Sequence, residues 1–186
     1  MIEDRIDLLM REHPDLFPTR AKFWSFLRGC LRRGLWEKSP LKIRAKNNKM
    51  TPPPTEYTGR GRKGAYCALT GEWTPTSKME VDHIDGHKPL LCEDDIIPYM
   101  IHLLAIEKEL DVVDKEAHKI KSYAERMGIT FEQAVIEKDI IAFAKKSVQE
   151  QIDVLTSLGR LPEKTTKVAL KKAYSEFKRG EAKATL

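Results

Sequence analysis

The sequence predicts a mainly helical protein (mainly α, α+β) with a small strand-containing unit near the middle of the chain. Apolar residues recur at three- and four-residue spacing before residue 39 and again after residue 129, a pattern typical of amphipathic helices. Between these regions, Met79–Ile84 alternates apolar and polar side chains as a half-buried strand does. We therefore expect a bundle-like set of helices that surrounds a short unit of strands.

Length and composition narrow the class of protein. A chain of 186 residues with 41% hydrophobic residues can form one domain, or one small domain with helical additions. The sequence contains neither an apolar run long enough to span a bilayer nor the apolar stretch after a basic start that marks a signal peptide. Three unevenly spaced cysteines argue against a disulfide framework. We expect a cytoplasmic protein that does not enter a membrane.

Two helices are expected in the first 38 residues. The first covers Ile2–Glu12 and ends before Pro14. The second begins near Thr19 and continues until Ser39-Pro40, with apolar and aromatic residues on one face and arginines on the others. Its tryptophans are expected in the core rather than as stacking platforms for bases.

Residues 39–64 are rich in proline, glycine and charge, which predicts an extended connector without a core of its own. The stretch from Arg28 to Lys63 holds eleven Lys or Arg against two acids, so its local charge is +9 in a chain whose total is +5. Such a concentration of positive charge indicates a polyanion such as nucleic acid, although a solvated, flexible linker is the alternative. The candidate nucleic-acid contacts in this stretch are Arg28, Arg32, Arg33, Lys42, Arg44, Lys46, Arg60, Arg62 and Lys63.

The densest group of chemically active side chains is Val81–His87. It contains two carboxylates, Asp82 and Asp85, and two imidazoles, His83 and His87, within six positions. An Asp beside a His offers a hard oxygen ligand for a divalent cation next to a base that titrates near neutral pH. A polar turn, in which the Asp-Gly step simply reverses the chain, is the alternative for an isolated pair.

Three segments resemble the successive pieces of an HNH nuclease: Cys67–Gly71, Met79–Ile84 and Leu110–Lys121, the last with a histidine followed by basic residues. The match covers roughly residues 65 to 122, about a third of the chain. The family folds a two-strand, one-helix finger, the ββα-metal or His-Me finger, around one metal ion. Chains of this size with a helical surround resemble small HNH proteins encoded by phages. We expect four parts along the chain: an N-terminal helical segment at residues 1–38, a connector at 39–64, the finger with a helical insertion at 65–128, which is the part that the resemblance implies, and C-terminal helices at 129–186.

The resemblance also implies roles for individual residues. Asp82 and His118 would hold the cation, and a neutral His83 would act as the general base that takes a proton from water. His102, on a helix expected from about Asp94 to Glu107, is the other candidate for the second ligand. His118 is preferred because it follows the family's last motif, which makes His102 a packing or surface histidine.

The metal suggested by this ligand set is Mg²⁺ or Mn²⁺. Two protein ligands leave most of the coordination shell to water and phosphate, which suits these hard cations. Asp85 and His87, beyond the strand end, could add to the shell. Many HNH proteins also bind a structural zinc through two Cys-x-x-Cys pairs, but three of those four ligands are missing here and no structural zinc is expected. The aligned positions are Cys67, Thr70, Asp114 and Ala117, and we assign Cys67 to the core.

Two further features of the resemblance stay open. The family's middle residue, commonly Asn, aligns with Glu109 or nearby Asp111, where an acid could accept backbone hydrogen bonds or add a ligand. Lys119 and Lys121 follow the last histidine, but they do not share a helix face, so only one of them is expected to meet the same phosphate.

The remaining sequence predicts helices that support the core. Asp114 can cap the helix that carries the last histidine, and Gly128 ends it. Thr130–Gln133 forms a capping box for a helix expected to run to Gly159, and Pro162 would begin the last helix. Their amphipathic faces could provide a homodimer contact.

The leading interpretation is a metal-dependent DNA endonuclease that hydrolyses phosphodiester bonds by a one-metal HNH mechanism. If the chain is phage-encoded, it would act in the host cytoplasm, with phage or host DNA-processing proteins as possible partners. The alternative is a non-catalytic nucleic-acid-binding or packaging accessory protein that keeps an HNH-like scaffold. The missing middle Asn and the missing zinc ligands favour that alternative, and phosphate contacts alone do not separate DNA from RNA.

Overall fold

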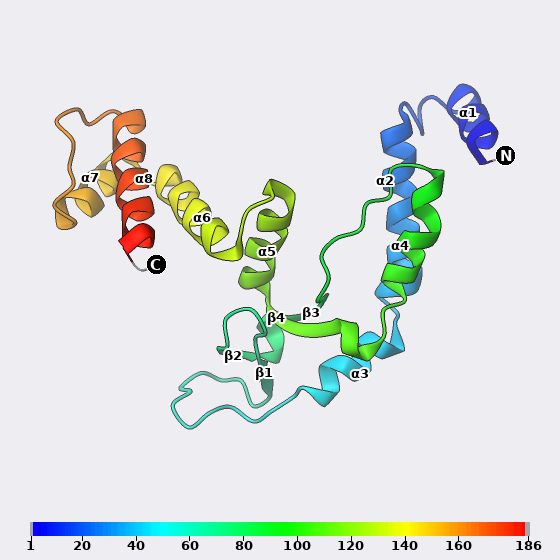
Figure 1. Ribbon diagram of the computed structural model, residues 1–186, viewed down its shortest axis with the longest axis horizontal. Coiled ribbons are helices and arrows are strands. Elements are labelled where there is room, and N and C mark those ends of the chain that lie inside the picture. Colours follow the sequence, from blue (N-terminus) through cyan, green and yellow to red (C-terminus); the bar gives the residue numbers. More distant parts are fainter. Residues whose placement is uncertain (1, 185–186) are drawn as a thin grey trace. The chain divides into compact units, whose positions relative to one another are not determined.

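The computed structural model of the protein describes residues 2–184. The chain divides into two compact units, residues 1–118 and 119–186, which we call the N-terminal and C-terminal units. Within the described residues, the structure is mainly helical and contains two small antiparallel sheets of two strands each (Figure 1). This confirms the predicted fold class at the level of helices with a small strand-containing part.

Helices α1 (Ile2–Glu12) and α2 (Arg20–Leu31) open the N-terminal unit as predicted. The Thr19 hydroxyl caps α2 by accepting a hydrogen bond from the Lys22 amide at 3.2 Å. After α2 the chain widens into a π-helical turn at Arg32–Trp36. The tryptophans of this region are buried in the core, as predicted.

Helix α3 (Pro40–Asn48) corrects the prediction that residues 39–64 are an extended connector. The Ser39 hydroxyl accepts a hydrogen bond from the Lys42 amide at 3.3 Å, so Ser39 is a helix cap. Proline is favoured at the first helical position because its missing amide would have no partner there. The Ser-Pro pair therefore begins a helix, and Ala45 in that helix is fully buried in the core.

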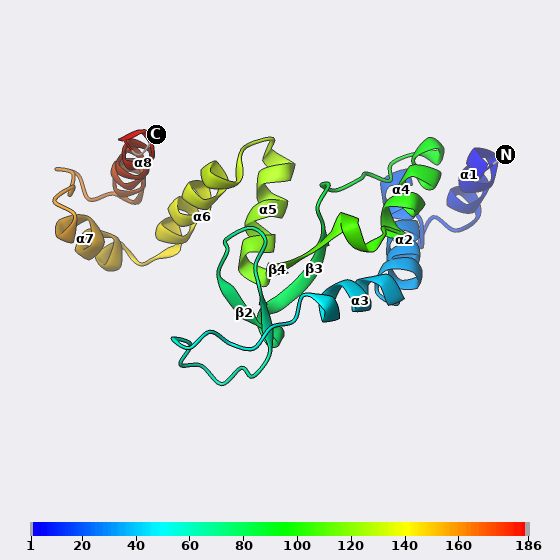
Figure 2. The same cartoon turned by 60° about the horizontal axis from the view of Figure 1, so that its bottom comes forward.

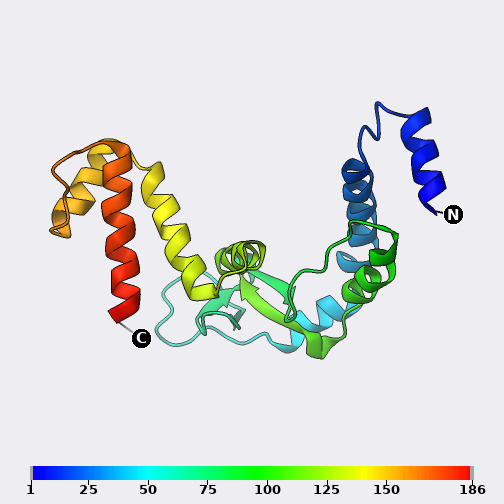
Figure 3. The ribbon, with the colours of Figure 1, turned by 45° about the horizontal axis from the view of Figure 1, so that its top comes forward.

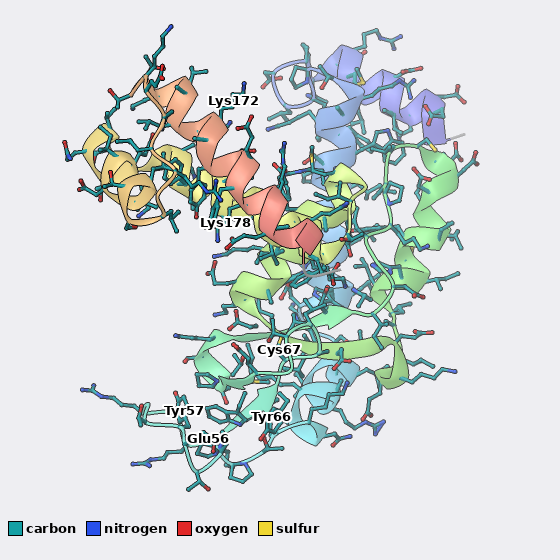
Figure 4. The ribbon with its side chains drawn as sticks, turned by 60° about the vertical axis from the view of Figure 1, so that its left-hand side comes forward. Glu56, Tyr57, Tyr66, Cys67, Lys172 and Lys178 are labelled. Atoms are coloured by element: carbon teal, nitrogen blue, oxygen red, sulfur yellow. The ribbon has the colours of Figure 1, made fainter. Side chains whose placement is uncertain are left out.

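The rest of the predicted connector, residues 51–64, is a loop closed at its base. Thr51 and Gly64 exchange two backbone hydrogen bonds, at 2.7 and 3.1 Å. The Tyr57 ring packs on Trp73 with 4.5 Å between ring centroids, and the Trp73 indole donates to the Thr51 hydroxyl at 3.2 Å. Figure 4 labels Tyr57 on this loop. The loop is thus held against the following hairpin rather than being a free arm.

The first sheet pairs β1 (Gly64–Tyr66) with β2 (Trp73–Pro75). β1 ends at Tyr66, and the chain turns over residues 68–70 before β2 begins. Gly71 has a φ of 71°, the left-handed conformation that glycine adopts most readily, and it allows this turn.

The second sheet pairs β3 (Met79–His83) with β4 (Leu110–Asp114) along their full lengths. Met79 lies opposite Asp114, and His83 lies opposite Leu110. Helix α5 (Lys115–Met127) follows β4 without a loop (Figure 2). Its first turn is capped by the Asp114 carboxylate, which accepts the amides of residues 116 and 117 at 2.8 and 3.3 Å.

Helix α4 (Ile96–Leu103) lies in the chain between β3 and β4. It is shorter than the helix predicted from Asp94 to Glu107, because 3-10 turns occupy Glu93–Asp95 and Glu107–Glu109. Figures 1 and 2 show α4 beside α2. Tyr99 and Leu103 on α4 are almost fully buried and join the core of the N-terminal unit.

The C-terminal unit contains α6 (Phe131–Lys145), α7 (Val148–Ser157) and α8 (Lys167–Ala184). α8 packs against both α6 and α7 (Figure 3). The residues at its centre are nearly fully buried: Ile140, Phe143, Leu155, Leu170 and Tyr174.

Helix boundaries in this unit are only partly as predicted. The capping box at Thr130 and the helix end at Gly128, with φ 64°, are confirmed. The single helix expected to continue to Gly159 is wrong, because Ser147 ends one helix and caps the next through a hydrogen bond from the Glu150 amide at 3.3 Å. The last helix begins after Thr166 rather than at the predicted proline.

The described residues contain no helix with both the length and the apolar character needed to cross a membrane.

The cap at the start of α5 predicts a specific loss of stability. Replacing Asp114→Ala removes the acceptor for two helix amides and should lower the free energy of unfolding by about 1 kcal/mol. Asp114→Asn keeps a side-chain oxygen in place and should cost only a fraction of that. Urea denaturation followed by circular dichroism measures both, and equal losses in the two variants would contradict the capping role.

Candidate functional site

The structure brings together two of the predicted site residues that are 36 positions apart in the sequence. His118 Nε2 lies 3.4 Å from Asp82 Oδ1. The cause is the strand register: because Met79 pairs with Asp114, the helix that follows Asp114 starts beside the beginning of β3. One turn into α5, His118 reaches back to β3.

This pair fits the donor set that a divalent cation requires. Two ligands at roughly 2.1 Å from one ion, at a right angle, lie about 3 Å apart. The Asp82 and His118 atoms are separated by 3.4 Å, so a small adjustment would let both contact one ion. A carboxylate oxygen is a ligand type that suits Mg²⁺ or Mn²⁺, whereas an imidazole nitrogen is more usual on transition metals such as zinc, iron or nickel.

Glu80 is a site residue that the sequence analysis missed. Its Oε2 lies 2.7 Å from His118 Nδ1, and because a carboxylate can only accept, Nδ1 carries the proton. Histidines that bind metals commonly donate their other ring nitrogen to a carboxylate in this way. Glu80 and Asp82 are two positions apart on β3 and so share one face of the strand, which is the signal that could have revealed Glu80.

The two carboxylates strongly affect His118. The pKa of His118 is raised to about 9, and the largest cause is its hydrogen bond to Asp82. The hydrogen bond to Glu80 and the negative charges of both carboxylates raise the pKa further, while partial burial acts against them. Near neutral pH the side chain is therefore an imidazolium held between two acids. A cation that binds Nε2 has to replace a proton.

Asp85 and His87 are exposed and lie beyond the end of β3. The described part of the chain contains no group of three or more His, Cys, Asp or Glu side chains arranged to hold an ion. The structure therefore does not add either residue to the Asp82–His118 pair.

His83 lies on the opposite face of β3 from Asp82, and it is 8% exposed. Its ring is stacked between Trp36, with 4.2 Å between ring centroids, and His102, with 3.8 Å. Burial, followed by the charge of His102, lowers the pKa of His83 to about 4, while a hydrogen bond to the backbone of His102 and the charge of Asp82 act in the opposite direction. His83 is therefore a neutral imidazole at pH 7, the form that a general base requires.

His102, the other candidate ligand, lies on α4 and packs against His83. It stacks on His83 and is half-buried, and burial is the main cause that lowers its pKa. Its stacking contact with the predicted site is the one with His83.

The two candidates for the middle residue have different contacts. Glu109 accepts the Ile106 amide through its carboxylate and the Ile84 amide through its carbonyl, both at 2.9 Å. It thus braces the turn before β4 by backbone hydrogen bonds. Asp111 lies opposite Asp82 in the sheet, and it pairs with Lys49 at 2.6 Å, which offsets the repulsion between the two facing acids.

A pocket of about 430 Å³ adjoins the Asp82–His118 pair. Glu80 and His118 form part of its lining. Four cationic side chains also line it, three from the turn after α2 and from α3 and one from α5: Arg32, Lys42, Lys46 and Lys115. Three of these four were predicted as nucleic-acid contacts, and the structure gathers them beside the candidate metal ligands.

The other predicted nucleic-acid contacts lie outside this lining. Arg60, Arg62 and Lys63 are exposed on the closed loop of residues 51–64. Arg44, on α3, lies 3.4 Å from Glu107. Arg28 and Arg33 belong to α2 and the turn after it, and the Arg33 guanidinium lies 3.6 Å from the Cys30 sulfur.

Lys119 and Lys121 fall in the C-terminal unit. Lys121 lies 3.6 Å from Glu125 one turn further along α5.

Cys67 and Asp114, two of the positions that align with the family's zinc ligands, are joined by a hydrogen bond. Cys67 is 1% exposed, which confirms its assignment to the core, and its sulfur accepts the Asp114 amide at 3.2 Å. The Ala68 amide donates to the Val112 carbonyl at 2.9 Å. These bonds join the first hairpin to β4, and Figure 4 shows Cys67 close to the strands.

Comparisons with protein-family models, with curated proteins and with solved structures give no match to this chain. The functional assignment therefore depends on the residues and the geometry of the site itself.

The burial of His83 predicts that the metal-free protein is destabilised in mild acid. The pKa falls from 6.5 to about 4 on folding, so this contribution to stability is complete above pH 6.5 and is lost as the pH falls through 4. Between pH 7 and pH 5, the free energy of unfolding should fall by about 2 kcal/mol more in the wild type than in His83→Leu. Urea denaturation at the two pH values measures this difference.

The comparison with His83→Leu is needed because the titration of His118 changes the free energy of unfolding in the opposite direction. Its raised pKa gives stability that is fully present below pH 6.5 and is lost as the pH rises through about 9. That contribution is common to both proteins and cancels in the difference. An identical pH dependence of the wild type and His83→Leu would contradict the buried, neutral state of His83.

Proposed function

We propose that this protein is a metal-dependent endonuclease of the HNH type, with β3, β4 and α5 as its ββα-metal finger. The observation that carries the proposal is the approach of Asp82 Oδ1 and His118 Nε2 to 3.4 Å, with Glu80 hydrogen-bonded to the far side of the His118 ring. An acid and a histidine that meet in this way, with a second acid behind the histidine, form a reasonable site for a divalent cation.

Each residue of the proposed site has a defined task. Asp82 and His118 would hold the ion, and Glu80 would keep the His118 proton on Nδ1 so that Nε2 is available. A bound Mg²⁺ or Mn²⁺ would supply charge stabilisation to the scissile phosphate and the leaving oxygen. Glu109 maintains the turn before β4 through its two backbone hydrogen bonds, the role proposed here for the family's middle residue.

His83 is the proposed general base. Its lowered pKa keeps the ring neutral at the pH of the cell, and the hydrogen bond to the backbone of His102 holds its orientation. Proton transfer from water requires access to a ring that is stacked between Trp36 and His102. We infer that substrate binding shifts this stack.

DNA is the proposed substrate. The local charge of +9 between Arg28 and Lys63 supports binding to a phosphate backbone, and the cationic pocket beside His118 provides a surface where a strand can lie. The exposed arginines at positions 60 and 62, on a loop that is closed at its base, would add further phosphate contacts.

Cleavage of supercoiled plasmid tests the proposal. The purified protein should convert it to open-circle or linear DNA with Mg²⁺ or Mn²⁺ and should be inactive in EDTA. His83→Ala should reduce the rate by about 100-fold or more, as expected on removal of a general base. His87→Ala, an exposed histidine outside the pair, is the matched control and should retain activity.

A second candidate is a nucleic-acid-binding protein that has lost the chemistry. The burial of His83, on the face of β3 opposite to Asp82, favours it. If the wild type and His83→Ala bind DNA equally and neither cleaves it with any of these metals, this second function replaces the nuclease.

Metal binding should release a proton from His118. Since the pKa of His118 is about 9 without metal, an ion that takes Nε2 at pH 7 must displace close to one proton. The apparent affinity for Mn²⁺ should therefore fall by about tenfold for each pH unit between pH 8 and pH 7. Isothermal titration calorimetry in buffers of different ionisation enthalpy measures the proton count. Binding of Mn²⁺ without proton release would show that His118 is not a ligand.

A further inference from the structure

We propose that the pocket next to the Asp82–His118 pair binds a second phosphate of the same nucleic-acid strand, and that Glu37 restrains two of its cations until that phosphate arrives. This inference rests on the proposed nuclease function and specifies part of its substrate: a strand that carries a phosphate beside the scissile one.

The pocket is shaped by two walls of the N-terminal unit. Lys42 and Lys46 are one helical turn apart on α3 and so present their side chains to the same side. Lys115 and His118, from the first turn of α5, contribute to the other wall. The Lys115 ammonium is fixed by donating to the Ser77 carbonyl at 2.9 Å. A volume of about 430 Å³ is large enough for a phosphate group with its adjoining sugar.

The charge in this pocket is mostly positive. Four Lys or Arg side chains line it, against two carboxylates, Glu37 and Glu80. Glu80 is hydrogen-bonded to the imidazole of His118 and so belongs to the candidate metal site. Glu37 is the remaining acid that faces the cations.

Glu37 occupies the place that a phosphate would take. One of its oxygens lies 3.2 Å from Lys42 Nζ, and the other lies 3.6 Å from Arg32 Nε. A carboxylate and a phosphate offer the same pair of oxygens to a guanidinium and an ammonium group. The Glu37 side chain is half-exposed, so it can turn into solvent when a phosphate binds both cations.

Lys42 is the best-positioned cation in the pocket. Its ammonium lies 4.6 Å from the centre of the Trp36 ring, and its side chain is 22% exposed. The same Trp36 ring stacks on His83. A phosphate that draws Lys42 away from Trp36 would therefore act on the ring that covers the proposed base, which links occupation of the pocket to access to His83.

Binding of a fluorescein-labelled DNA duplex to the metal-free protein in EDTA tests the pocket without requiring catalysis. Lys42→Met should weaken binding by about fivefold or more and should reduce the slope of log affinity against log salt by about 0.9, the loss of one phosphate contact. Lys38→Met removes the same charge from an exposed lysine outside the pocket lining and should have a smaller effect.

Glu37→Gln provides the opposite test. It releases Arg32 and Lys42 and should tighten DNA binding by about three- to tenfold, beyond any effect of the charge-matched control Glu56→Gln. Glu56 is an exposed acid on the loop of residues 51–64 (Figure 4). A gain in affinity cannot come from a variant that fails to fold, so this arm stays informative if Lys42→Met is unstable. Equal affinities of Glu37→Gln and Glu56→Gln would overturn the proposal.

The experiments distinguish an error in the proposed phosphate pocket from an error in the proposed nuclease function. With Mn²⁺, bis(p-nitrophenyl) phosphate offers a single phosphate and reports on the proposed metal site, so loss of its hydrolysis in Asp82→Ala tests the nuclease, while duplex binding by Lys42→Met and Glu37→Gln in EDTA tests the pocket. Unchanged duplex binding in both pocket variants, with hydrolysis by the wild type intact, would overturn the pocket and keep the nuclease. Absence of all cleavage, with the expected binding changes in EDTA, would remove the nuclease but keep a phosphate-binding pocket.

Discussion

The register of the β3–β4 pair is the constraint on which the candidate site depends. Five consecutive residue pairs connect the strands, and the last residue of β4 is at once the partner of Met79 and the cap of α5. The helix can therefore start at only one place along β3. A slip of one residue in this pairing would turn Asp82 to the buried face and would move His118 away from it. Backbone hydrogen bonds thus set a side-chain distance across a long stretch of sequence, with Cys67 holding the preceding hairpin to the same strand end.

The sequence was sufficient for those parts of the fold that depend on local signals. The helix caps at Thr130 and Asp114, the helix end at Gly128 and the alternating strand that begins at Met79 were all predicted, because each is decided by a few neighbouring residues. The errors arose where one local signal has two meanings. A Ser-Pro pair can end a helix or begin one. Here it begins α3, and the reason is the burial of Ala45 in a core made by residues far away in the sequence.

The candidate site was predicted less completely, for a physical reason. The pairing of Asp82 with His118 was expected from the resemblance to HNH nucleases, and the structure brings the two residues together. Glu80 was missed although its position on the strand indicated a shared face with Asp82. The roles of Glu37 and Trp36 could not be predicted, because they depend on how the turn after α2 packs against β3. For the same reason, the enclosure of the proposed base by the rings of Trp36 and His102 could not be predicted.

We propose that the β3–β4–α5 unit presents an acid and a histidine to a cation, while cations from α3 and the preceding turn hold the strand to be cut. Anomalous diffraction from crystals soaked in Mn²⁺ tests directly whether Asp82 and His118 bind the same ion. We expect one strong anomalous peak within bonding distance of Asp82 Oδ1 and His118 Nε2. A peak bound by other residues, with His118 still hydrogen-bonded to both acids, would contradict this proposal.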